Sequence, residues 1–289
     1  IPVDRSVVAC MRRALLLLVL VGATAVAEQK CGQVKVNPVV ASMVSVSNQT
    51  GNAIIGGTQA AEGAWPWTVS ICILDWFGGC QFRAAGAIIS DRWVVTAYSA
   101  VDPVYATKYR VRAGSSSNIY GGQFVQVKSI VNPRDANTDN HHADLALVEL
   151  DTPLQFTDFV QPICLPSSDD DALQPFTLDW FAGWGMTSAS APAQETYLQQ
   201  TQMRVTDGFG CPKYYDKEVQ ICGGGGNGGN ACSFDAGGPL MQQTGGVWYL
   251  YGVAVNTDYA SSGCTRPAVL TRVTAYCDYI KQTSGVSCQ

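Results

Sequence analysis

The chain has only two imidazole side chains, and both stand close to a carboxylate. His141 and His142 come just before Asp144. Hydrolysis by a serine nucleophile needs a hydroxyl, an imidazole that takes its proton and a carboxylate that orients the imidazole. We expect the two histidines to lie in the loop that enters the following apolar run. Adjacent residues of a strand point to opposite faces, so we assign them neither a catalytic nor a metal-binding role.

Other motifs that bind metals or phosphates are missing from the sequence. The cysteines show neither CxxC spacing nor the Cys/His spacing of a zinc site. Residues 223–229 are rich in glycine, but no Lys-Ser/Thr pair follows, as a phosphate-binding loop requires. We therefore predict no metal and no cofactor.

The first methionine, Met11, opens a pattern typical of a secretory signal. Two arginines follow it, residues 14–21 are apolar, and residues 25–27 read Ala-Val-Ala, the small-x-small form of a signal-peptidase site. The apolar run is shorter than the roughly 20 residues that cross a bilayer. We predict upstream residues and a signal peptide over 1–27, with the signal at about 11–27, and a secreted, extracellular protein.

The polar residues 28–53 predict a pro-segment, and Asn48 within it opens a glycosylation acceptor, Asn-Gln-Thr. Residues 1–27 carry one aspartate and three arginines, so their removal changes the net charge from -5 to -7. This acidic balance disfavours nucleic acid and anionic membranes as partners. We expect a protein partner and no stable membrane insertion. The cysteines beyond the signal are even in number, which indicates disulfides and an oxidising compartment.

From Ile54 onward, short β-rich runs are separated by glycine, proline, asparagine and aspartate. Predicted strands include residues 67–73, 87–89, 93–97, 124–131, 145–150 and 247–255. Only residues 273 to about 282 predict a helix. This spacing is typical of β-sandwiches and barrels, and the length fits one large all-β domain or two small ones. A segment rich in proline and aspartate, 161–175, could link two halves.

Seven further motifs occur in a definite order. They are Ile54-Ile55-Gly56-Gly57 with Trp65-Pro66-Trp67, Trp93-Val94-Val95-Thr96-Ala97, Asp144-Leu145-Ala146-Leu147, Pro162-Ile163-Cys164-Leu165-Pro166, Gly183-Trp184-Gly185, Asp235-Ala236-Gly237-Gly238-Pro239-Leu240 and Thr271-Arg272-Val273. In this order and spacing they resemble the trypsin/chymotrypsin serine proteases from about Cys31 to Lys281. The resemblance implies an all-β domain at 54–289. It would consist of two six-stranded antiparallel β-barrels with the active site between them and a C-terminal α-helix.

The resemblance also implies disulfides. It pairs Cys31 with Cys164, Cys211 with Cys222, and Cys232 with Cys264. Two further family disulfides lose both ends, one at Ala84 and Ala100 and one near Asp179 and Gln242. Cys72 and Cys80 flank a predicted hairpin loop and could close it, and Cys277 and Cys288 then remain to join the helix to the tail.

The resemblance places two unsuitable residues in the catalytic triad. The histidine position is Ser99, the nucleophile position is Ala236, and only Asp144 agrees with the family. A serine hydroxyl cannot act as a base near neutral pH, and alanine has no group that attacks a carbonyl. In serine proteases the loss of either group costs about 10⁶ in rate.

Other positions of the family site depart as well. Phe234 replaces an oxyanion-hole glycine, and the base of the specificity pocket corresponds to Asn230. The substrate-binding edge corresponds to Val255, Asn256 and Thr257. The activation pocket would join the Ile54 amine to Asp235, but Asn52-Ala53 precede Ile54 and offer no tryptic site, although an elastase-like cut remains possible. The calcium site of some relatives is not expected, because no carboxylate occurs between Arg110 and Arg134.

These observations lead to four hypotheses. The first is a secreted, non-catalytic serine protease homologue that binds a protease, an inhibitor or a substrate protein. The second is a hydrolase with an unconventional nucleophile such as Ser99, for which the sequence offers no visible base. The third is an antimicrobial or glycan-binding module, and the fourth is a remnant without a selected role.

Overall fold

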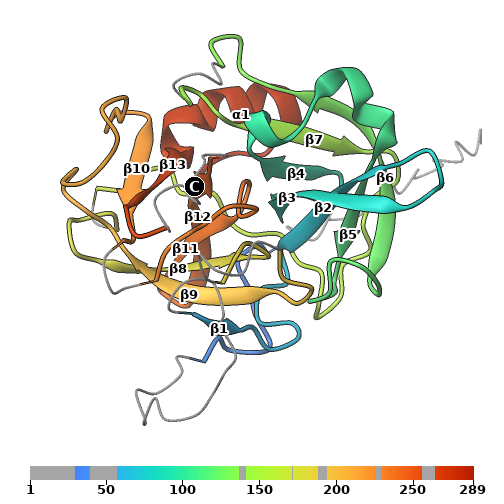
Figure 1. Cartoon of the computed structure of the whole chain (residues 1–289), viewed down its shortest axis with the longest axis horizontal. Coiled ribbons are helices and arrows are strands. Elements are labelled where there is room, and N and C mark those ends of the chain that lie inside the picture. The colour runs from blue at the N-terminus through green and yellow to red at the C-terminus, as the bar shows by residue number, and fades with distance from the viewer. Residues whose placement is uncertain are drawn as a thin grey trace, which may run out of the picture.

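The computed structural model describes residues 30–39, 57–136, 141–170, 172–187, 194–225, 229–255 and 264–289. It is built almost entirely from antiparallel strands arranged in two halves, with a short helix near the C-terminus (Figure 1). No helix among these residues has the length and apolar character needed to cross a membrane.

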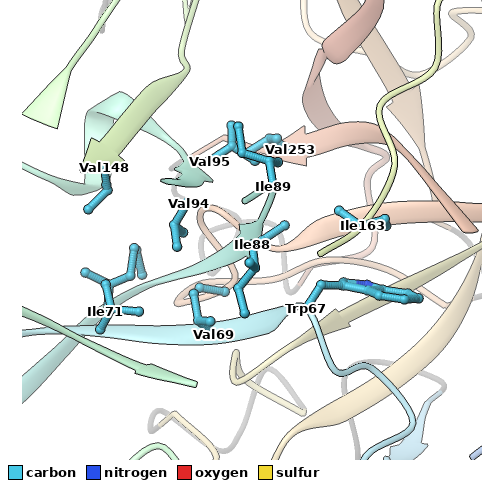
Figure 2. Close-up of a cluster of buried hydrophobic side chains, with 14 of the residues drawn as sticks. Trp67, Val69, Ile71, Ile88, Ile89, Val94, Val95, Val148, Ile163 and Val253 are labelled. Carbon is cyan, nitrogen blue, oxygen red and sulfur yellow. The ribbon is translucent and has the colours of Figure 1, made fainter. Parts of the chain in front are cut away.

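The first half is a closed barrel of six strands in the order β2-β3-β4-β7-β6-β5. The strands are β2 (Thr68–Leu74), β3 (Cys80–Ile88), β4 (Trp93–Thr96), β5 (Tyr109–Ala113), β6 (Gln123–Val131) and β7 (Ala146–Leu150). Alternate residues of a strand face the interior, and Val69, Ile71, Val94 and Val148 fill it from three strands (Figure 2). All four are fully buried.

The second half is a curled sheet with the order β1-β9-β8-β11-β12-β13-β10. Its strands are β1 (Thr58–Gln59), β8 (Leu178–Gly183), β9 (Gln199–Arg204), β10 (Gln220–Gly223), β11 (Pro239–Thr244), β12 (Val247–Ala254) and β13 (Ala268–Arg272). A single bridge from Val205 to Gly223 joins the end of β9 to β10. The predicted all-β fold is therefore confirmed: the first half is the expected closed six-stranded barrel, and the second is a curled seven-stranded sheet in which β9 and β10 meet at a bridge rather than in a full ladder.

The predicted C-terminal helix divides into two segments. A 3₁₀ turn, η4 (Val273–Tyr276), leads into α1 (Cys277–Ser284). Ile280 is fully buried, and Gly285 ends the helix in the left-handed conformation, with φ of 79°. Two short 3₁₀ helices, η1 (Tyr98–Ala100) and η2 (Pro103–Lys108), follow β4.

Five disulfides join the described residues, and they are the five pairs expected from the sequence: Cys31–Cys164, Cys72–Cys80, Cys211–Cys222, Cys232–Cys264 and Cys277–Cys288. The first ties residues 30–39 to the domain. The Gly32 amide also donates to the Pro162 carbonyl, at 2.8 Å. This part of the predicted pro-segment is thus packed against the domain.

Candidate functional site

Strand pairing brings Ser99 and Asp144 together. Thr96 at the end of β4 lies opposite Ala146 at the start of β7, so the residues just beyond the two strand ends meet. The Ser99 amide donates to Oδ1 of Asp144 at 2.7 Å, and the Ser99 hydroxyl donates to Oδ2 at 2.6 Å. Asp144 is fully buried. A buried carboxylate is costly unless it accepts hydrogen bonds, and Ser99 supplies two.

His141 completes this cluster from the other side of the carboxylate. Its Nδ1 atom lies 3.0 Å from Oδ2 of Asp144, and its side chain is 13% exposed. His141 has a φ of 53° and belongs to a turn before β7. His141 therefore lies outside the strand that was expected to set its direction, and its ring faces the Asp144 carboxylate. His142 faces away, with its Nδ1 atom 3.7 Å from a carboxylate oxygen of Asp135.

Neighbouring elements hold the His141 turn in place. The Gln220 side-chain amide donates to the His141 carbonyl at 3.0 Å, and the Tyr214 ring lies 5.8 Å from the imidazole ring. The Thr271 hydroxyl donates to the Asp144 carbonyl at 2.8 Å. Gln220 and Thr271 both belong to the second half, so the cluster lies where the two halves meet.

The Ala236 segment docks against β3 and the end of β4. The Ala236 carbonyl accepts the Ala85 amide at 2.8 Å, which ties the segment to β3. The next residue, Gly237, has a φ of 81°, and a Cβ atom there would overlap the Ala85 carbonyl and the Thr96 hydroxyl. Only glycine fits so close an approach. The methyl group of Ala236 is buried and carries no reactive atom.

Asp235 lies in a buried cradle made by two backbone amides. Its Oδ1 accepts from Gly185 at 2.8 Å and its Oδ2 from Cys232 at 2.9 Å. Burial raises the pKa of Asp235 to about 7, although the two hydrogen bonds oppose that rise. A Cβ atom at Gly183 or Gly185 would collide with this carboxylate, which explains both glycines. The Asp235 carboxylate is therefore buried, and each of its oxygens accepts a hydrogen bond.

Phe234 and Asn230 flank this segment. Phe234 has a φ of 73°, which non-glycine residues rarely adopt, and its side chain is 41% exposed. Asn230 is fully buried, and its amide donates to the Cys264 and Arg266 carbonyls at 2.7 and 2.8 Å. The donors of Asn230 are thus used by the protein itself.

Comparison with protein families decides what this architecture is. The family model described as Trypsin matches residues 54–280. The chain belongs to the trypsin family. The two halves of antiparallel strands fit this assignment.

Set against the trypsin family, the cluster has its groups in a different order. The family mechanism requires the imidazole between the hydroxyl and the carboxylate. Here the carboxylate lies between the other two groups, because Ser99 and His141 both contact Oδ2 of Asp144. Of the residues predicted for the triad, Ser99 and Asp144 are in contact, and His141 joins them from a position that the sequence comparison does not use.

The other predicted positions are only partly described. Val255 is buried, and its amide donates to the Val269 carbonyl at 3.2 Å. Asn256, Thr257, Ile54 and Asn48 lie outside the described residues. Within the described residues no group of three His, Cys, Asp or Glu side chains is arranged to hold a metal ion.

Proposed function

We propose that this member of the trypsin family is a secreted, non-catalytic protein that acts by binding other proteins. Candidate roles are regulator, cofactor or decoy in a proteolytic or defence pathway. The observation that carries the proposal is Ala236, which offers no attacking atom at the nucleophile position. Without it, the family mechanism cannot form an acyl-enzyme.

The Asp144 cluster supports the same proposal. Ser99 is the residue at the general-base position, and its hydroxyl donates a hydrogen bond to the Asp144 carboxylate at 2.6 Å. His141 contacts that carboxylate rather than the segment that carries Ala236. Phe234 adds a bulky residue where the family places an oxyanion-hole glycine, so the remaining source of rate acceleration is altered as well.

Secretion rests on two independent features. Residues 11–27 have the pattern of a signal peptide, and five disulfides join the described residues. Disulfides persist in oxidising compartments and are rare in the cytosol. Expression in a secretory host, followed by assay of the medium and N-terminal sequencing, tests this part directly.

A second function, hydrolysis by Ser99, is favoured by one observation. The Ser99 hydroxyl and the His141 imidazole both lie within hydrogen-bond distance of one carboxylate oxygen, Oδ2 of Asp144. In this alternative Asp144 would accept the Ser99 proton and His141 would support the carboxylate. Because an ionised carboxylate is a weak base for a hydroxyl, we regard binding as the better-supported function.

One experiment separates the two functions. The purified protein is incubated with a broad peptide panel and a fluorophosphonate probe, both intact and after limited cleavage by an elastase. An active family member serves as the positive control. We expect neither turnover nor labelling above buffer in either preparation. Activity that Ser99→Ala abolishes would establish the hydrolase, and activity that survives Ser99→Ala would assign it to another group; either result rejects the non-catalytic proposal.

A further inference from the structure

The hairpin that joins β2 to β3 presents two aromatic side chains to solvent at its tip. Trp76 is 95% exposed and Phe77 is 98% exposed, the highest values among large hydrophobic residues that the structure describes. The hairpin projects from the barrel on the right of Figure 1. By contrast, Trp65, Trp67 and Trp248 are almost completely buried. Large exposed apolar surfaces of this kind mark interaction sites.

The hairpin tip is held in one conformation. The Cys72–Cys80 disulfide closes its base, with a Cα–Cα distance of 5.4 Å. Oδ1 of Asp75 accepts the Phe77 and Gly79 amides at 2.9 and 2.8 Å. The tip therefore has little backbone freedom to lose when it binds, and a preorganised surface binds more tightly than a flexible one.

A second segment extends the apolar surface. The Nζ atom of Lys108 lies 5.2 Å from the Trp76 ring centre and 5.0 Å from that of Tyr105. Tyr105 and Val104, both in η2, are 47% and 82% exposed. Lys108 thus links the hairpin tip to η2. We call Trp76, Phe77, Val104 and Tyr105 the aromatic patch.

The charges around the aromatic patch are mainly positive. Arg110 of β5 lies opposite Cys72 of β2, and its guanidinium donates to the Thr107 carbonyl beside Lys108. On β3, Arg83 follows Phe82, the residue that pairs with Cys72 on the other side. The two carboxylates of this region, Asp75 and Asp102, accept backbone amides of their own turns. Three cations and two carboxylates leave a local charge of +1 in a chain whose total is -5.

We propose that the aromatic patch docks an acidic segment of a partner protein in which apolar side chains alternate with carboxylates. Tryptophan and tyrosine are the residues that most often dominate protein interfaces, and aromatic anchors bury about 150–250 Å² each. The patch can therefore supply most of the roughly 800 Å² that one side of a standard interface buries. The cations select carboxylates, because complementary charge steers association and like charge opposes it.

The charges favour a protein over the two other possible occupants. An anionic membrane extends well beyond the patch and would also face the rest of a chain with a net charge of -5, whereas a short acidic segment meets only the local cations. A second copy of the chain would place Lys108, Arg83 and Arg110 against the same three cations. An acidic, apolar segment satisfies both the exposed rings and the cations.

Binding is measured by fluorescence anisotropy with three sets of labelled peptides of about 12 residues. The first set alternates Asp or Glu with Leu or Phe, the second replaces the acids by Lys, and the third replaces the apolar residues by Ser. We expect saturable binding of the first set only. W76S/F77S should weaken it by about 30-fold, the effect of losing a hot spot. K108E should weaken it by about 10-fold and reduce its salt dependence.

The matched control is Phe209→Ser, which removes a ring that is 87% exposed in another loop. It should leave peptide affinity unchanged, and all variants should keep the wild-type thermal midpoint. Equal binding of the three peptide sets, or wild-type affinity in W76S/F77S, would reject the proposal. So would binding of anionic vesicles without binding of acidic peptides, or dimerisation that W76S/F77S abolishes. None of these readouts depends on turnover, so a failure here is distinguishable from a failure of the proposed function.

Discussion

The Nδ1 atom of His141 lies 3.0 Å from Oδ2 of Asp144, the same oxygen that accepts the Ser99 hydroxyl. Two side chains 42 positions apart in the sequence therefore share one buried acceptor. A carboxylate oxygen can accept more than one hydrogen bond, so the arrangement satisfies Asp144 without any imidazole at position 99. Asp144 is the centre of a buried hydrogen-bonded cluster, and this has consequences for stability that can be measured.

His141→Ala should lower the free energy of unfolding by about 1–2 kcal/mol, because it removes a hydrogen bond from a buried carboxylate. Ser99→Ala should have a similar effect. The two bonds end on one oxygen, so the double variant should deviate from the sum of the single variants. Urea denaturation measures all three. The control is His142→Ala, whose imidazole lies 3.7 Å from an exposed aspartate and should matter by less than about 0.5 kcal/mol. Equal effects of His141→Ala and His142→Ala would contradict the role assigned to His141.

Restoring the family residues should restore activity in stages. We expect no activity from Ala236→Ser alone, because Ser99 stands at the position of the family's base. S99H/A236S supplies both groups and should raise fluorophosphonate labelling by about 10²-fold or more over Ala236→Ser. His141 competes for Asp144, so adding His141→Ala should raise the rate again. The assay uses the intact and the elastase-cut preparations. If S99H/A236S is labelled no faster than Ala236→Ser, the absence of these two triad groups is not what limits the reactivity of the site.

The backbone at Phe234 predicts an unusual order of stability. With a φ of 73°, a side chain at this position costs about 1 kcal/mol that glycine avoids. Phe234→Gly should therefore be more stable than Phe234→Ala by about 1 kcal/mol in thermal unfolding. Comparing the two variants cancels the loss of the ring. At Phe209, whose φ is not positive, the same pair should show the opposite order or no difference. The same order at both sites would show that Phe234 carries no strain.

Much of the fold could be predicted because its signals are local. The predicted strand at 124–131 appears as β6 (Gln123–Val131), and the one at 247–255 as β12 (Val247–Ala254). Both were predictable because they are rich in β-branched and aromatic residues and lie between turns. Three cysteine pairs followed from the family resemblance, Cys72–Cys80 from the predicted hairpin, and Cys277–Cys288 by elimination. What the sequence did not indicate was the bridge that completes the second half, which depends on how far the sheet curls.

The site was harder to predict than the fold. Ser99, Asp144 and Ala236 were placed by their motifs, but His141 was assigned to a loop without a role. Its contact depends on left-handed backbone at His141 and at Ala143, which residue types alone rarely indicate. The only available signal was its position three residues before a carboxylate. The partners of Asp235 in an uncut chain could not be named from the sequence either, because the amides of Gly185 and Cys232 reach the carboxylate only in three dimensions.

Asp179 in β8 predicts a dependence of stability on pH. It is 1% exposed, and neither of its carboxylate oxygens has a hydrogen-bond partner among the described residues. Burial raises its pKa to about 7. In the unfolded chain an aspartate has a pKa of about 3.9. The folded state therefore binds more protons between these values, so its stability falls as the pH rises from about 4 to 7 and levels off above that.

Asp179→Asn removes the charge and keeps the shape of the side chain. Its excess in free energy of unfolding over the wild type should be about 2–3 kcal/mol larger at pH 8 than at pH 5, because the folded wild-type carboxyl is neutral at pH 5 and charged at pH 8, while the unfolded one is charged at both. Urea denaturation at the two pH values measures the difference. Asp235, whose pKa is raised in the same direction, should leave a residual slope in the variant. The control Asp151→Asn changes an exposed carboxylate and should be neutral at both pH values. If Asp179→Asn destabilises the protein more at pH 8 than at pH 5, the carboxylate is charged and paired in the folded state, which would refute this account.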